Sequence, residues 1–195
     1  MRSLLLVIAA AILFTSCKKA ADSVIQAMAK PSSSGFIQYT KQKGHQYCDQ
    51  TGYKPVDLTE MKFTVKFDST AIYQCASAEN QYDINKLYGF SDNNSDHHQY
   101  SARFGWRWSD KALRLFAYVY NHGEVVSKEI TAVPIGQEVN CSIRVAGKQY
   151  VFTVNDTFVQ LSREAATDSA KGYQLYPYFG GDETAPHEID IWIKG

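Results

Sequence analysis

A strict alternation of apolar and polar residues runs through much of the chain from residue 36 onward, and it restricts the fold to one built from β-strands. The alternation is clearest in residues 61–67, 100–108 and 113–120. A period of two places successive side chains on opposite faces of a strand. Further strand candidates, separated by turn residues, are 124–130, 139–145, 149–154, 157–161, 173–179 and 188–194.

Strands that recur roughly every ten residues with turns between them are typical of an antiparallel sandwich. We therefore predict an all-β fold, an antiparallel β-sandwich of the jelly-roll type, for a single domain at residues 36–195. The one helical segment that we expect inside this domain is residues 162–170.

The two clearest strands predict which side chains are buried. On each of them one face is apolar, so we expect Trp106 and Leu115 in the core and Arg107 and Tyr118 exposed. If these strands pair, arginine and tyrosine side chains share one face of the sheet. The residues of this predicted Arg/Tyr face are Arg103, Arg107, Tyr118 and Tyr120, with Tyr176 and Tyr178 as extensions.

An Arg/Tyr face suits a sugar ligand. Aromatic rings stack on sugar C–H faces, and guanidinium groups bind carboxylates or sulfates with two parallel hydrogen bonds. The alternative is an ordinary solvent-exposed face on which long amphipathic side chains cover the sheet.

Two polar loops are further candidates for a site. Residues 92–98 contain Asp92, His97 and His98 together with other oxygen-rich side chains, and could bind Ca²⁺, although a polar turn is the simpler interpretation. In an extended chain His97 and His98 point to opposite sides, so we expect them not to share a metal ion. We expect no cofactor and no metal site.

The second loop follows the last tyrosines of the chain. Asp182, Glu183 and His187 lie after a Gly-Gly pair and could supply an acid/base group, or could form a structural turn.

The cysteines give a weaker prediction. Cys48 and Cys75 lie near turns or strand ends and are the candidates for a disulfide, whereas Cys141 lies on the apolar face of a strand and reads as a buried free thiol. No cysteine or histidine spacing is typical of zinc.

The first residues read as an export signal. Arg2 precedes the apolar run 4–14, and Ser16 precedes Cys17. This arrangement resembles a bacterial lipobox, which implies a signal peptide at 1–16, lipid attachment at Cys17 and a tether at 17–35. We accordingly expect an exported protein that is lipid-anchored in the cell envelope, at the outer membrane.

Three motifs resemble those of concanavalin-like or laminin-G-like jelly rolls, over residues 55–194. They are Ser-Ala-Arg-Phe-Gly-Trp-Arg at 101–107, Tyr-Val-Tyr-Asn-x-Gly at 118–123, and Val-x-Gly-x-x-Tyr-x-Phe-x-Val-Asn at 145–155. With the lipobox, the chain is similar to secreted lipoproteins of Bacteroidetes. The resemblance implies a glycan ligand, since many relatives of this fold bind or cleave glycans.

Three functions remain open at this point. The leading hypothesis is a non-catalytic glycan-binding lipoprotein. The alternatives are a polysaccharide lyase or glycoside hydrolase of the same fold, and an accessory subunit of an outer-membrane protein complex. Residues 188–193 resemble the catalytic strand of family-16 glycoside hydrolases, but Ile193 stands where the second glutamate is needed, so we reject that assignment. No catalytic residue is assigned. With 20 basic and 20 acidic residues, nothing indicates nucleic acid as a partner.

Overall fold

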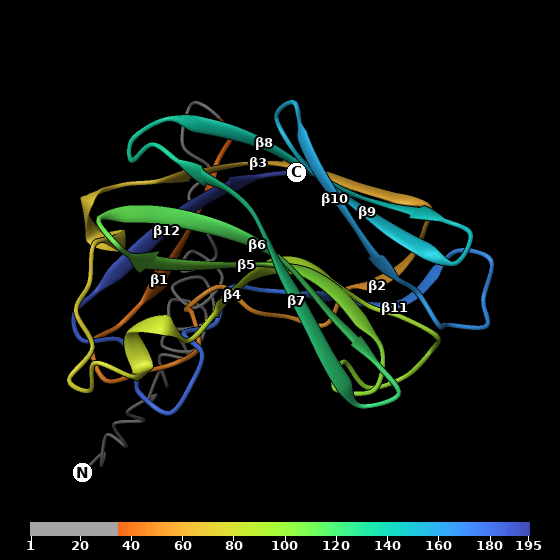
Figure 1. Ribbon diagram of the computed structural model, residues 1–195, viewed down its shortest axis with the longest axis horizontal. Coiled ribbons are helices and arrows are strands. Elements are labelled where there is room, and N and C mark those ends of the chain that lie inside the picture. Colours follow the sequence, from red (N-terminus) through yellow and green to blue (C-terminus); the bar gives the residue numbers. More distant parts are fainter. Residues whose placement is uncertain (1–34) are drawn as a thin grey trace, which may run out of the picture. The chain divides into compact units, whose positions relative to one another are not determined.

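The computed structural model describes residues 35–195, which form two six-stranded antiparallel sheets (Figure 1). The first sheet has the order β1 (Ile37–Lys41), β12 (Ile189–Lys194), β3 (Glu60–Phe67), β8 (Glu138–Ala146), β9 (Gln149–Val154) and β10 (Thr157–Ser162). The second has the order β2 (Pro55–Leu58), β11 (Ala170–Leu175), β4 (Asn85–Ser91), β5 (Ser101–Ser109), β6 (Ala112–Asn121) and β7 (Glu124–Val133). Two 3-10 turns, η1 (Ser69–Ala71) and η2 (Asn80–Tyr82), complete the described elements. The predicted antiparallel β-sandwich is thus confirmed.

The hydrophobic core lies between the two sheets, and the alternating pattern places its side chains correctly. Trp106 on β5 and Leu115 on β6 are paired residues and are both fully buried. Phe104 on β5 contacts Phe63 on β3 and Phe152 on β9, with ring centroids 5.5 and 5.3 Å apart. Edge-to-face contacts of this kind therefore join the two sheets.

Three strands, β1, β2 and β4, were not predicted. Strand β4 is buried on both faces, so its sequence shows no alternation to reveal it. Strand β11 ends at Leu175 rather than near residue 179, and Pro177, which has no N–H group, follows in the chain.

The prediction of a helix at 162–170 is wrong. Residues 163–169 form an irregular loop between β10 and β11, and the side chain of Arg163 is buried beneath it. Arg163 Nε donates to Asp92 Oδ2 over 2.8 Å, and its other nitrogens donate to Thr167 and Ser169. Tertiary hydrogen bonds thus override the local helix preference of this segment.

The predicted Cys48–Cys75 disulfide is also wrong. Both residues are buried free thiols in the described part of the chain, with separate surroundings. Cys48 Sγ donates to the carbonyl of Gln50, whereas the Cys75 backbone N–H is bound by Gln81. Cys141 is a buried free thiol, as predicted, and burial raises the pKa of its thiol well above its usual range.

Residues 1–34, which include Cys17, the signal peptide and most of the tether, lie outside the described residues. Within residues 35–195, no helix is long and apolar enough to cross a bilayer.

Candidate functional site

A groove of about 700 Å³ lies on the second sheet and is the best candidate for a functional site. It is lined by strand residues and by the loops at residues 47–53, 97–98 and 176–181. The charged, aromatic and amide side chains in its lining are Tyr47, Tyr53, Lys86, His97, His98, Arg103, Tyr120, Tyr173, Gln174, Tyr176 and Tyr178. None of the described residues that line it is an aspartate or a glutamate.

Two cations that line this groove lie against the same aromatic ring. Lys86 Nζ is 4.6 Å from the ring centroid of Tyr118, and the guanidinium carbon of Arg103 is 5.6 Å from it. Arg103 and Tyr118 are paired residues on β5 and β6, and Lys86 comes from the neighbouring β4. A side chain at Gly180 would come within 2.8 Å of Lys86 Nζ, so glycine there leaves the space that the amine occupies.

Burial strengthens the electrostatic conflict between these cations. Only 6 % of Arg103 is exposed, and its Nε has no hydrogen-bond partner among residues 35–195. Burial lowers the pKa of Arg103, and the charged forms of Tyr118, Tyr120 and Tyr173 oppose this shift. Burial, with a contribution from Arg103, lowers the pKa of Lys86 to about 8. The two groups repel each other, and an anion in the groove would relieve that repulsion.

Exposed tyrosines form the walls of the groove. Tyr53 is 81 % exposed and Tyr47 is 60 % exposed, which is unusual for such large rings. Tyr53 leans over Tyr173 with ring centroids 6.0 Å apart, and Tyr178 donates its hydroxyl to Gln46 Oε1. Flat rings around a polar floor are suited to stacking with sugars.

The Arg/Tyr face predicted from the sequence is only partly the lining of the groove. Arg103, Tyr120, Tyr176 and Tyr178 line it, but Arg107 and Tyr118 do not.

The exposure expected for Tyr118 is wrong. Tyr118 is only 9 % exposed, because the side chains of Lys86 and Arg103 cover its ring. Burial also raises the pKa of Tyr118 to about 12. Arg107 is half-buried: it donates to the Tyr82 carbonyl over 2.8 Å and lies over the ring of Phe116. Arg107 therefore links η2 to β5 of the second sheet through a hydrogen bond.

His97 and His98 lie together, contrary to the expectation from an extended chain. Their ring centroids are 4.1 Å apart. The reversal has a local cause, since Asn93 and Asn94 have positive φ angles of 58° and 53° and the loop turns back on itself. Asp96 then accepts a hydrogen bond from the His98 backbone N–H.

The neighbouring Asp92 is not available to bind Ca²⁺. It is fully buried, and its carboxylate accepts hydrogen bonds from Arg163, Tyr150 and the backbone N–H of Lys171. Its oxygens join the loop after β4 to the loop before β11. Asp92 is thus a structural residue.

The second candidate loop does not supply an acid/base group. Glu183 accepts the backbone N–H groups of Ala76 and Ser77, each over 2.8 Å, and these bonds lower the pKa of its carboxyl. The His187 ring nitrogen Nε2 is 2.8 Å from the Thr70 carbonyl. Asp182 is exposed, and none of the three lines the groove. The structural interpretation of this loop is the one that the contacts favour.

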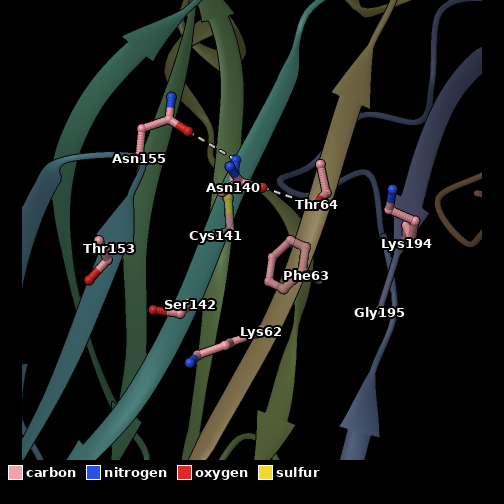
Figure 2. A pocket seen from close by; sticks show the side chains of 10 residues that line it. All are labelled: Lys62, Phe63, Thr64, Asn140, Cys141, Ser142, Thr153, Asn155, Lys194 and Gly195. Atoms are coloured by element: carbon pink, nitrogen blue, oxygen red, sulfur yellow. Dashed lines mark hydrogen bonds between the residues drawn. The ribbon is translucent and has the colours of Figure 1, made fainter.

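A second pocket, of about 460 Å³, lies on the outer side of the other sheet, along β3, β8 and β9 (Figure 2). Thr64 Oγ1 donates to Asn140 Oδ1, and the Asn140 backbone N–H donates to Asn155 Oδ1. Apart from Lys62 and Lys194, its exposed side chains are short and polar. It lacks the combination of cations and exposed rings that the groove has.

Sequence reasoning missed several groove residues, chiefly Lys86 and Tyr173. Lys86 is the one charged residue in β4, whose other residues are all buried. A lone lysine in an otherwise apolar run was the available signal. Tyr173 lies within the predicted strand 173–179, but strict alternation placed it on the face opposite to Tyr176 and Tyr178. All three line the groove because β11 ends at Leu175 and the alternation does not continue beyond it.

Known proteins resemble this chain in fold only. No protein-family model matches the sequence, and no curated protein matches it. Among solved structures, the alginate lyase AlyC3 aligns with a TM-score of 0.55 at 10 % identity, covering 86 % of this chain and 76 % of that one. Alginate lyase A1-II′, of polysaccharide lyase family 7, gives 0.52 at 12 % identity over 86 % and 80 % of the two chains.

A glycoside hydrolase family 16 endo-glucanase from Bacteroides ovatus gives a TM-score of 0.54 at 11 % identity, covering 85 % of this chain and 81 % of that one. The chain therefore has the jelly-roll fold that these lyases and hydrolases share, as the sequence motifs implied.

Proposed function

We propose that the protein binds an acidic polysaccharide in the groove and cleaves it by β-elimination, which makes it a polysaccharide lyase. The observation that carries this proposal is the pair of cations, Lys86 and Arg103, held against Tyr118 in a groove whose described lining includes no acidic residue. The ligand that this arrangement favours is an anion. The exposed rings of Tyr47 and Tyr53 favour a sugar polymer over a small ion.

The groove supplies groups for the elimination. A buried guanidinium binds a uronate carboxylate strongly and withdraws charge from it, which acidifies the C–H bond next to the carboxylate. Arg103 has this role. A base then removes that proton, the electrons of the broken C–H bond form a C4–C5 double bond, the C4–O bond breaks, and the leaving oxygen takes up a proton from water or from the protonated base.

Lys86 is the candidate base. Its lowered pKa of about 8 leaves a useful fraction of neutral amine at mildly alkaline pH. Its Nζ donates to the Ile84 carbonyl over 2.7 Å, which fixes its position in the groove. The rate should therefore rise with pH as Lys86 loses its proton.

Retaining hydrolysis is less well supported. It requires two carboxylates on either side of the scissile bond, and the described groove lining contains none. Asp190, from the segment that resembles the family-16 strand, lies on β12 of the other sheet, where Thr40 donates to it over 2.6 Å.

The test is to follow ultraviolet absorbance during incubation with polyuronates and with neutral glucans. The wild-type protein should produce the absorbing unsaturated sugar from a polyuronate only. Arg103→Ala should lower kcat/KM roughly 100-fold, because one charged donor to the transition state is lost. The matched control is Arg144→Ala, which removes an exposed arginine from the other sheet and should leave the rate unchanged.

Binding without any absorbance change would overturn the lyase proposal. It would favour the non-catalytic glycan-binding function instead. Neither binding nor cleavage, together with copurification of an envelope protein, would favour the accessory-subunit function.

We also propose that the protein is a lipoprotein of the cell envelope, anchored through Cys17. The support is the lipobox-like sequence before Cys17, with a charged start and an apolar run. Cys17→Ser should leave an unlipidated precursor that no longer incorporates labelled fatty acid. Fatty-acid labelling that is unchanged in Cys17→Ser would contradict this.

A further inference from the structure

We propose that Asp96, His97 and His98 bind a divalent transition-metal ion, such as Zn²⁺, at the edge of the groove. The three residues are consecutive, and one ligand atom from each lies within 4.8 Å of the others. Imidazole and carboxylate together are a donor set suited to Zn²⁺, Ni²⁺ or Cu²⁺ rather than to Ca²⁺. The site lies in the same groove as Lys86 and Arg103 but uses neither of them as a ligand.

Each histidine nitrogen lies near an oxygen of the Asp96 carboxylate. His97 Nδ1 is 3.6 Å from Asp96 Oδ2, and His98 Nδ1 is 3.5 Å from Asp96 Oδ1. With metal–ligand bonds of about 2.0–2.1 Å, two ligands of a tetrahedral Zn²⁺ ion are about 3.3–3.4 Å apart. The three side chains must therefore rotate to bring one ligand atom from each, now within 4.8 Å of the others, to that separation.

The backbone of this loop is held independently of the histidine rings. The N–H groups of Gln99 and Tyr100 donate to the Asp96 carbonyl over 2.9 and 3.1 Å, and the Asn94 N–H donates to the Lys171 carbonyl. The two imidazoles are thus brought side by side by the fold. A preformed ligand set lowers the entropic cost of binding a metal ion.

The surrounding charges allow the ion but limit its affinity. Asp96 supplies one negative charge, whereas Arg103 is close enough to His97 to oppose a cation. The Tyr173 hydroxyl lies 2.9 Å from His97 Nδ1 and 3.4 Å from Asp96 Oδ2, so it must move aside or become a further ligand. We therefore expect an exchangeable ion.

Three protein ligands leave at least one coordination position open. Because His97 and His98 line the groove, that position is accessible to an oxygen of a ligand in it. This last step rests on the proposed function, since it needs an acidic polysaccharide in the groove. The metal site itself does not.

The test uses the full chain with Cys17→Ser, without a polyhistidine tag, stripped with a chelator and titrated with Zn²⁺ in a calorimeter in the absence of polysaccharide. We expect one ion per chain. His98→Ala should weaken binding at least about tenfold, since it removes a ligand outright. Asp96→Asn should weaken it too, and circular dichroism checks that both variants fold.

His122→Ala is the matched control. His122 is an exposed histidine that contacts Tyr100 and Glu164 instead, and its loss should leave Zn²⁺ binding unchanged. No Zn²⁺ binding by the wild-type chain would overturn the proposal. Equal affinity in wild type and His98→Ala would overturn it as well. Because no polysaccharide is present, neither result depends on the lyase activity.

Discussion

Replacing Asp92 with asparagine should lower the free energy of unfolding by about 3–5 kcal/mol, as removal of one partner of a buried ion pair does. Asp92 is fully buried and Arg163 is 3 % exposed, so the substitution leaves a guanidinium without a counter-charge inside the protein. The Tyr150 hydroxyl and the Lys171 N–H lose a charged acceptor at the same time. Urea unfolding followed by tryptophan fluorescence measures the change.

The control for this prediction is a surface ion pair in the same part of the sheet. Lys171 Nζ and Asp57 Oδ2 are 3.6 Å apart and both side chains are exposed. Asp57→Asn should leave the unfolding midpoint nearly unchanged because solvent screens such pairs. If Asp92→Asn and Asp57→Asn have similar effects, the buried pair is not a major source of stability. Replacing both Asp92 and Arg163 by apolar residues should recover part of the loss.

Replacing Lys41 with methionine should stabilise the protein at pH 7 by about 3 kcal/mol. Lys41 is on β1, fully buried, and its Nζ has no hydrogen-bond partner in the part of the chain that the structure describes. Burial lowers its pKa from 10.5 to about 8, partly offset by the charges of Cys48, Asp190 and Asp49. Each unit of lowered pKa corresponds to about 1.4 kcal/mol of cost for the charged form. Methionine keeps the length of the side chain without the charge.

The sign of the pH dependence follows from the lowered pKa. Below pH 8 the amine is charged in both the folded and the unfolded chain, so the full cost is present. Between pH 8 and 10.5 the unfolded chain binds more protons than the folded one, and stability rises with pH. The advantage of Lys41→Met should therefore shrink between pH 7 and pH 10.

Paired urea titrations at these two pH values measure that difference. Lys62→Met, at an exposed position on β3, serves as the control and should show no such pH dependence. An advantage of the same size at both pH values would mean that the charge of Lys41 is not its source.

The alternation in the sequence was enough to predict the sandwich, most strand positions and four of the residues that line the groove. It placed Arg103 and Tyr120 on the outward face because the period of two is set by backbone geometry. It failed where an element is buried on both sides, as in β4, so Lys86 was not found. It also misjudged Tyr118, since alternation gives the face of a residue but not what covers that face.

The loops were harder to predict because their geometry depends on contacts distant in sequence. Asp92 and Arg163 are 71 residues apart, and no local sequence pattern predicts that they form an ion pair. His97 and His98 were expected to diverge, and the two positive-φ asparagines before them bring them together instead. A single sequence offers no direct signal for either arrangement.

The Asp92–Arg163 pair has a consequence for how this protein can evolve. On its buried side, the loop that carries the two histidines is held in place by this pair. The histidine rings, Lys86 and the exposed tyrosines line the groove. Residues that hold the backbone and residues that meet a ligand are thus different residues. Mutations in the groove can accumulate at little cost to folding, whereas the anchoring pair cannot drift one residue at a time. Descendants of this chain would be free to change what the groove binds while keeping Asp92 and Arg163.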